Sequence, residues 1–113
     1  MSVEKNIRSN RALITGGTDG IGLATAKLLL KQGYQVFICG RKITKLKSAL
    51  DKLKGTNSKR NVSGVICDVR ELESVSVMFN EAISFMGGID ILINNAGVAV
   101  VAPLEELSTE EWN

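Results

Sequence analysis

The feature that most constrains the fold of this chain is a regular alternation of short apolar runs with longer amphipathic segments. Hydrophobic periodicity and glycine breaks predict strands at 12–15, 35–39, 62–67 and 89–93, and helices at 21–32, about 44–54 and 72–86. The strand segments are continuous apolar runs, which is typical of strands buried on both faces of a sheet. Strictly alternating strands and helices indicate right-handed βαβ units. We therefore expect an α/β fold, a doubly wound parallel sheet that is incomplete, with about four strands and three helices.

The composition excludes several classes of protein. With 113 residues, 44% apolar and 23% charged, the chain has the size and content of one small globular domain, not of a disordered or disulfide-framework protein. Histidine is absent, which removes the commonest general base and metal ligand, and no metal site is expected. Cys39 and Cys67 lie in apolar runs without C-x-x-C spacing. They are interpreted as small buried hydrophobes, not as a zinc site or redox pair.

No segment is typical of a secretory signal or a membrane span. Residues 1–11 are polar and charged, without an apolar core. The longest uncharged stretch, 91–104, contains two asparagines, a glycine and a proline, and falls short of the roughly 20 apolar residues that a spanning helix needs. We expect no membrane partner and a cytoplasmic location.

Charge is distributed unevenly along the chain. Residues 1–60 carry 13 Lys and Arg against three acids, whereas residues 61–113 carry one basic residue against nine acids. The basic half could meet nucleic acid, a phosphate or an acidic partner, or could be a solvated helix surface. The basic segment 41–60 has no aromatic residue for base stacking, so a nucleic-acid partner is not expected.

A glycine-rich loop joins the first predicted strand to the first predicted helix. Glycine is needed there if the turn is tight and a phosphate must approach the backbone closely. The helix start adds unpaired N–H groups and a positive dipole end, which together favour an anion. A tight turn without a ligand is the plainer alternative, which we consider weaker because the strand and helix required by the motif are both predicted. The candidate binding residues of this loop are Gly16, Thr18, Asp19, Gly20, Ile21 and Gly22.

The spacing of this loop, T-G-x-x-x-G-x-G, resembles the marker of the classical short-chain dehydrogenase/reductase family. Asp68-Val69 and the sequence N-N-A-G at 94–97 resemble two further motifs of that family, each after the expected strand. The resemblance covers residues 11–113 and is closest to 3-oxoacyl-[acyl-carrier-protein] reductase-like and tropinone-reductase-like members. It implies that residues 1–113 are the N-terminal part of a single Rossmann-like NAD(P)-binding domain, with no second domain.

The resemblance also implies roles for residues beyond the loop. Asp68 would accept a hydrogen bond from the adenine amino group, with Val69 as an apolar wall; a helix N-cap is the plainer interpretation of Asp68, and the two roles are compatible. The backbone of Asn95, Ala96 and Gly97 would approach the adenosine ribose. Asn94 is expected instead to tie neighbouring strands together.

The residues after the second predicted strand indicate which nucleotide is bound. NAD-binding Rossmann units usually place an acid there to bind the ribose hydroxyls. Here Gly40 is followed by Arg41 and Lys42. A guanidinium pairs well with a phosphate, so we expect NADP (NADPH) in preference to NAD, with Arg41 at the 2′-phosphate. Asp19 weakens this expectation, because many NADP-preferring relatives carry a basic residue at that loop position.

No catalytic residue is assigned. The family uses a serine and a Y-x-x-x-K pair, but Tyr34 is the only tyrosine and Ile38 lies four residues after it. We therefore expect an NADP-dependent oxidoreductase acting on a small carbonyl or alcohol substrate as a homo-oligomer, represented here by an inactive cofactor-binding fragment. The alternative is a natural, non-catalytic short protein that binds a nucleotide or a partner through the open edge of the fourth strand.

Overall fold

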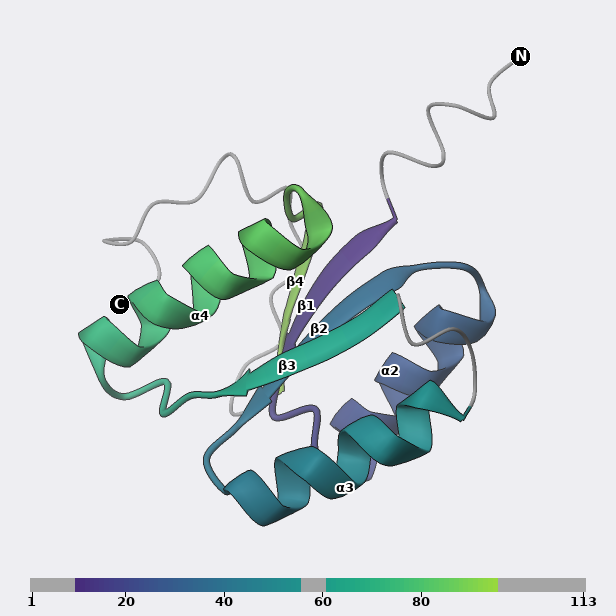
Figure 1. Ribbon diagram of the computed structural model, residues 1–113, viewed down its shortest axis with the longest axis horizontal. Coiled ribbons are helices and arrows are strands. Elements are labelled where there is room, and N and C mark those ends of the chain that lie inside the picture. The colour runs from purple at the N-terminus through teal and green to yellow at the C-terminus, as the bar shows by residue number, and fades with distance from the viewer. Residues whose placement is uncertain (1–9, 56–60, 96–113) are drawn as a thin grey trace.

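The computed structural model describes residues 10–55 and 61–95 and shows three helices and four strands in strict alternation (Figure 1). In chain order the elements are β1 (Arg11–Thr15), α2 (Gly20–Lys31), β2 (Gln35–Gly40), α3 (Ile43–Lys54), β3 (Val62–Ile66), α4 (Leu72–Met86) and β4 (Ile91–Asn94). The α/β prediction is confirmed. The predicted boundaries are correct within two residues, and the largest difference is at β4, which begins at Ile91 and not at Ile89.

The four strands form one parallel sheet in the order β3-β2-β1-β4. Ala12 of β1 pairs with Val36 of β2 on one side and with Ile91 of β4 on the other. Helices α2 and α3 cover one face of this sheet and α4 covers the opposite face (Figure 1). The result is the three-layered, doubly wound arrangement that the alternation predicted.

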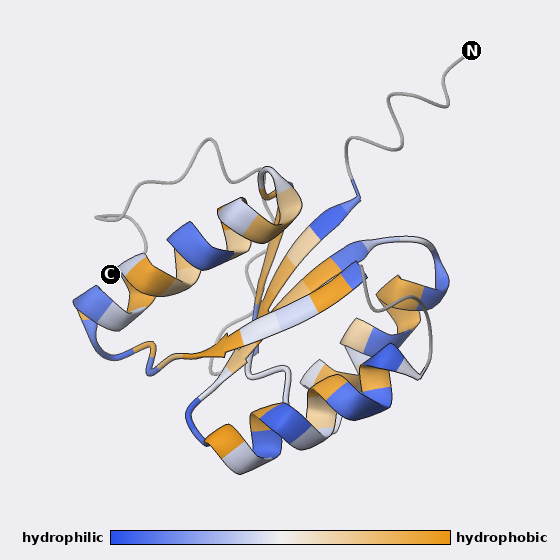
Figure 2. Ribbon diagram, in the orientation of Figure 1, coloured by the Kyte–Doolittle hydropathy of each residue, from blue (hydrophilic) through white to orange (hydrophobic). Residues whose placement is uncertain are grey.

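Neighbouring residues of each strand supply the two halves of the core. Leu13 and Phe37 point toward α4, where Met78 is fully buried. Ile14 and Ile38, one residue further along, pack on the opposite face with Leu30, Leu46 and Leu53 of α2 and α3. Figure 2 shows mainly apolar strands, whereas α3 alternates between hydrophobic and hydrophilic residues. Burial of each large aliphatic side chain stabilises the fold by about 1.5–3 kcal/mol, so this two-sided burial fixes the sheet that carries the site.

Among the described residues, no helix is both long and apolar enough to cross a membrane. Ser108, followed by Glu110 and Glu111, has the sequence pattern of a helix N-cap, but these residues lie outside the described part of the chain.

Candidate cofactor-binding site

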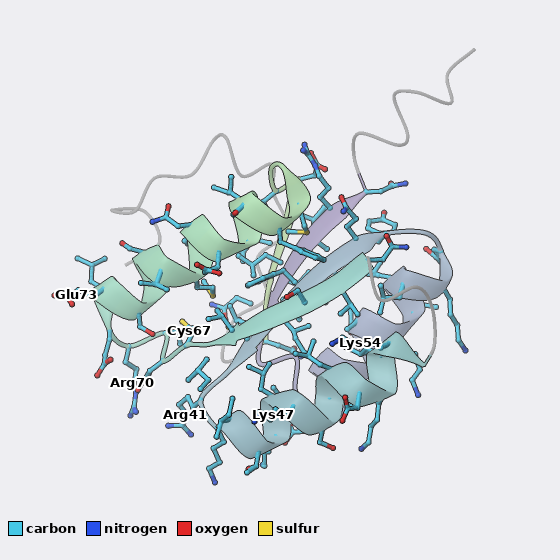
Figure 3. All side chains as sticks on the ribbon, in the orientation of Figure 1. Arg41, Lys47, Lys54, Cys67, Arg70 and Glu73 are labelled. Atoms are coloured by element: carbon cyan, nitrogen blue, oxygen red, sulfur yellow. The ribbon has the colours of Figure 1, made fainter. Side chains whose placement is uncertain are left out.

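The carboxyl ends of β1, β2 and β3 meet around a cavity of about 480 Å³. Because parallel strands end at one edge of a sheet, the loops that follow them converge there, which is where open α/β sheets bind ligands. Figure 3 shows Arg41, Cys67 and Arg70 gathered at this end. The lining residues are Gly16, Thr18, Asp19, Cys39, Gly40, Arg41, Lys42, Lys45, Cys67, Asp68, Val69 and Arg70. The cavity thus brings together part of the glycine loop, the basic residues after β2 and the Asp-Val pair after β3.

The glycine loop is held by close backbone packing against the start of α2. A methyl group on Gly22 would lie 2.5 Å from Nδ2 of Asn95 and still closer to the carbonyl oxygen of Gly16. The backbone N–H of Gly17 donates to the carbonyl of Cys39 at 3.2 Å, which fixes the loop to the end of β2. Gly22 therefore packs the helix onto the loop and does not line the cavity.

Gly40 has a similar role at the end of β2. A side chain there would meet Cγ2 of Thr18 at 2.6 Å, so the absence of a Cβ lets Thr18 lie directly against the strand. An acid at this position would collide with the loop in this arrangement. The local packing therefore accounts for glycine where many NAD-binding domains carry a carboxylate.

Four basic side chains and two carboxylates line the cavity, a local charge of +2. Nζ of Lys45 lies 3.1 Å from Oδ2 of Asp19. Arg70 donates to both oxygens of Asp68, from Nε at 2.9 Å and from Nη2 at 2.8 Å. Since Lys45 and Arg70 pair with the two carboxylates, the remaining positive charge is that of Arg41 and Lys42, which follow β2. A cavity with this balance favours an anionic ligand such as a phosphate.

Asp68 is ionised at neutral pH. Hydrogen bonds from the Arg70 guanidinium, and then from the Arg70 backbone N–H, lower the pKa of Asp68 to about 2. The carboxylate is thus a permanent acceptor beside the cavity. The alternative interpretation of Asp68 as a helix N-cap is wrong, because Glu71 occupies the N-cap position of α4. The Asp68 carboxylate instead accepts from the backbone N–H of Arg70, which closes a local turn. Both of its oxygens also accept from the Arg70 guanidinium.

The tie between β1 and β4 is confirmed. The fully buried Thr15 hydroxyl donates to Oδ1 of Asn94 at 2.7 Å and accepts from the backbone N–H of Asn95 at 3.0 Å. Asn95 is thereby fixed next to the glycine loop, outside the cavity lining. Gly20 and Ile21 also lie outside the lining, and the Ile21 side chain is 78% exposed at the start of α2. Ala96 and Gly97 lie outside the described residues.

Both cysteines are buried, as predicted, and both also line the cavity. A hydrogen bond to Cys67, together with burial, raises the pKa of the Cys39 thiol far above its usual range. Cys67 in turn donates to the Ser74 carbonyl at 3.6 Å. The described residues contain no group of three or more His, Cys, Asp or Glu that could hold a metal ion.

Sequence reasoning did not identify Lys45 and Arg70 as cavity residues. One signal was present for each: Lys45 lies in the first turn of the helix predicted directly after Arg41 and Lys42, and Arg70 follows two residues after Asp68. The two cysteines gave no such signal, because Cys39 lies on β2 and Cys67 follows β3, and residues that two strands bring together share no fixed sequence spacing.

The geometry agrees with comparisons to known proteins. A family model described as short chain dehydrogenase matches residues 10–113. Chlorophyll(ide) b reductase NOL of Oryza sativa subsp. japonica is 45% identical over 100 residues, covering 87% of this chain and 29% of that protein.

Two solved structures are similar at the level of the fold and of the sequence. An NADPH-bound short chain oxidoreductase from Pseudomonas aeruginosa has a TM-score of 0.76 and 33% identity, covering 94% of this chain and 41% of that chain. A variant of actinorhodin polyketide ketoreductase with NADPH has a TM-score of 0.74 and 35% identity, covering 93% and 40%. The chain thus spans less than half of the length of each of these relatives.

Proposed function

Because the chain belongs to the short-chain dehydrogenase family, we propose that it is the cofactor-binding part of an NADP-dependent oxidoreductase. The observation that carries this proposal is the cationic cavity at the ends of β1, β2 and β3, in which both carboxylates are already paired. Hydride would pass between the nicotinamide and a carbonyl or hydroxyl group of a small substrate. The NADPH in the two solved relatives supports the choice of cofactor.

The residues present fit the adenosine half of NADP. Gly16 and Thr18 line the cavity and leave room for the pyrophosphate near the loop backbone. A side chain at position 40 would collide with Thr18. Arg41 would bind the 2′-phosphate. The ionised Asp68 would accept from the adenine amino group, and Val69 would supply an apolar wall.

In this arrangement the cofactor and the protein have separate roles. When bound, the cofactor supplies the hydride chemistry. The residues of this chain bind and orient its adenosine end, and none of them is assigned a proton-transfer role. We propose that the 113-residue chain binds NADP without turning over a substrate, and that proton transfer in an active enzyme depends on a serine and a Y-x-x-x-K pair, a spacing that these 113 residues do not contain. A cytoplasmic homo-oligomer is part of the same proposal.

The test is binding of NADPH and NADH, each followed by the fluorescence of its nicotinamide. Arg41→Ala should weaken NADPH binding about tenfold or more and leave NADH nearly unchanged, because a charge-assisted hydrogen bond contributes about 1.5–3 kcal/mol. Lys47→Ala is the matched control, since Lys47 is exposed on α3 and does not line the cavity (Figure 3). Equal affinity of the wild type for the two dinucleotides, or an Arg41→Ala effect on both, would contradict the NADP assignment.

A further inference from the structure

Asp19 occupies the N-cap position of α2 without capping the helix. Its backbone is extended, with φ −158° and ψ 177°, and its carbonyl accepts from the Leu23 N–H at 3.2 Å, as an N-cap carbonyl does. The side chain nevertheless makes no cap hydrogen bond. Its carboxylate lies 3.1 Å from Nζ of Lys45, which belongs to the first turn of α3.

This choice of partner matters because aspartate is among the preferred N-cap residues. A capping Asp19 would accept hydrogen bonds from the second or third N–H of α2, those of Ile21 and Gly22. The same N–H groups, at the positive end of the helix dipole, are the donors that a helix N-terminus offers to a phosphate. A carboxylate placed there would compete with a bound pyrophosphate for donors and repel its charge.

We infer that Lys45 is a positioning residue of the cofactor site: by pairing with Asp19 across two helices, it keeps that carboxylate off the N-terminus of α2 and leaves the N–H groups to the pyrophosphate. This inference rests on the proposed function. Both side chains are more than half exposed, so the pair itself contributes little to the stability of the fold. Its effect is on cofactor binding, because it holds the Asp19 carboxylate away from the N–H groups of α2.

A direct contact of Lys45 with the 2′-phosphate is the competing explanation, since Lys45 also lines the cavity. The two explanations differ in two respects. A change in the binding of the pyrophosphate alters the affinity for NADPH and NADH alike, whereas loss of a contact with the 2′-phosphate alters the affinity for NADPH alone. The positioning role also requires Asp19, whereas a direct contact does not.

The experiment is a double-mutant cycle on the 113-residue chain, with dissociation constants measured for both dinucleotides. Lys45→Met should weaken the binding of NADPH and of NADH by a similar factor of about three- to fivefold, the upper range for an exposed ion pair, because Lys45 can shift the carboxylate by no more than the strength of that pair. The same substitution should have no effect in an Asp19→Ala background, because alanine cannot cap. Lys45→Arg should retain tight binding, and Lys47→Met, the same charge change on the outer surface of α3, should stay within about twofold of the wild type.

A second readout needs no cofactor. In Lys45→Met, the released carboxylate should shift the amide proton of Ile21 or Gly22 downfield in nuclear magnetic resonance spectra, and Lys45→Met/Asp19→Ala should lack this shift. Loss of NADPH affinity alone, persisting without Asp19, would overturn the inference in favour of a direct contact. Unchanged affinities and unchanged amides would also overturn it. If the wild type binds neither dinucleotide but the amide shift appears, the proposed function fails and the positioning of Asp19 stands.

Discussion

The closest packing in the site predicts a large effect of a very small substitution, Gly22→Ala. The added methyl group would lie 2.5 Å from Nδ2 of Asn95 and 2.9 Å from the carbonyl carbon of Gly16, with the carbonyl oxygen closer still. An unstrained contact between such atoms is about 3.5–4.0 Å, so one side must move by about 1 Å or more. The crowding atoms of Gly16 belong to the backbone, which cannot rotate away, so α2 must shift relative to the loop.

The expected cost combines two opposing terms. Overpacking in a well-packed region costs about 1–3 kcal/mol, and a backbone contact this close lies at the upper end. Replacing glycine with alanine within a helix stabilises the helix by about 1 kcal/mol, because alanine has the higher helix propensity. Gly22→Ala should therefore lower the free energy of unfolding by about 2 kcal/mol, a large share of the stability of a small domain. It should also weaken NADPH binding, because the shift displaces the loop that lines the cavity.

Urea unfolding followed by far-ultraviolet circular dichroism measures the first effect. Gly55→Ala is the matched control, since a methyl group there meets nothing closer than 3.5 Å and the backbone, at φ −73°, suits alanine. The control should stay within about 0.5 kcal/mol of the wild type or be slightly more stable. Equal stability of Gly22→Ala and Gly55→Ala would refute the packing argument.

Two further substitutions test the hydrogen bonds of the site. Thr15→Val keeps the shape of a fully buried side chain but removes the hydroxyl that donates to Oδ1 of Asn94 and accepts from the N–H of Asn95, which keeps the Thr15 carbonyl as an acceptor, so urea unfolding should show a loss of about 1–2 kcal/mol; an unchanged midpoint would contradict this. Arg70→Met should raise the pKa of Asp68 from about 2 toward 3.8, measured by titration of its carboxyl resonance, because the guanidinium hydrogen bonds are the main cause of the lowered value. Since the folded pKa lies below the unfolded one, the stabilising effect of this pair is present above about pH 4 and disappears as the pH falls toward 2, and Arg70→Met should abolish that dependence.

The fold was predictable because its signals are local. The helix at Leu72–Met86 was predicted at both ends, since its apolar periodicity runs without interruption up to Gly87. The start of β4 was predicted too early for an identifiable reason. Ile89 is buried and continues the apolar pattern, but its backbone is not in the ladder, which begins only at Ile91. Burial and strand geometry are separate properties, and hydropathy reports the first.

The interactions that shape the site were not predictable, because they join residues that are distant in the sequence. Asp19 and Lys45 lie 26 positions apart and meet only once α2 and α3 pack side by side on the sheet. The contact between Cys39 and Cys67 depends likewise on the pairing of β2 with β3. For Asp68, the local N-cap rule offered an alternative role that failed, since α4 begins at Leu72 and its cap position falls on Glu71.

These pairings change the meaning of the charge pattern. From sequence, Asp19 weakened the expectation of NADP, because many NADP-preferring relatives carry a basic residue at that loop position. In the structure Lys45 neutralises it, so it no longer subtracts from the cationic cavity. The large excess of basic residues in the first half of the chain is equally misleading, because Lys47, Lys52 and Lys54 of α3 do not line the cavity. The proposed preference for NADP would therefore depend on the two cations that follow β2, Arg41 and Lys42, and a substitution at Arg41 should alter it more than removal of any charge from the outer surface of α3.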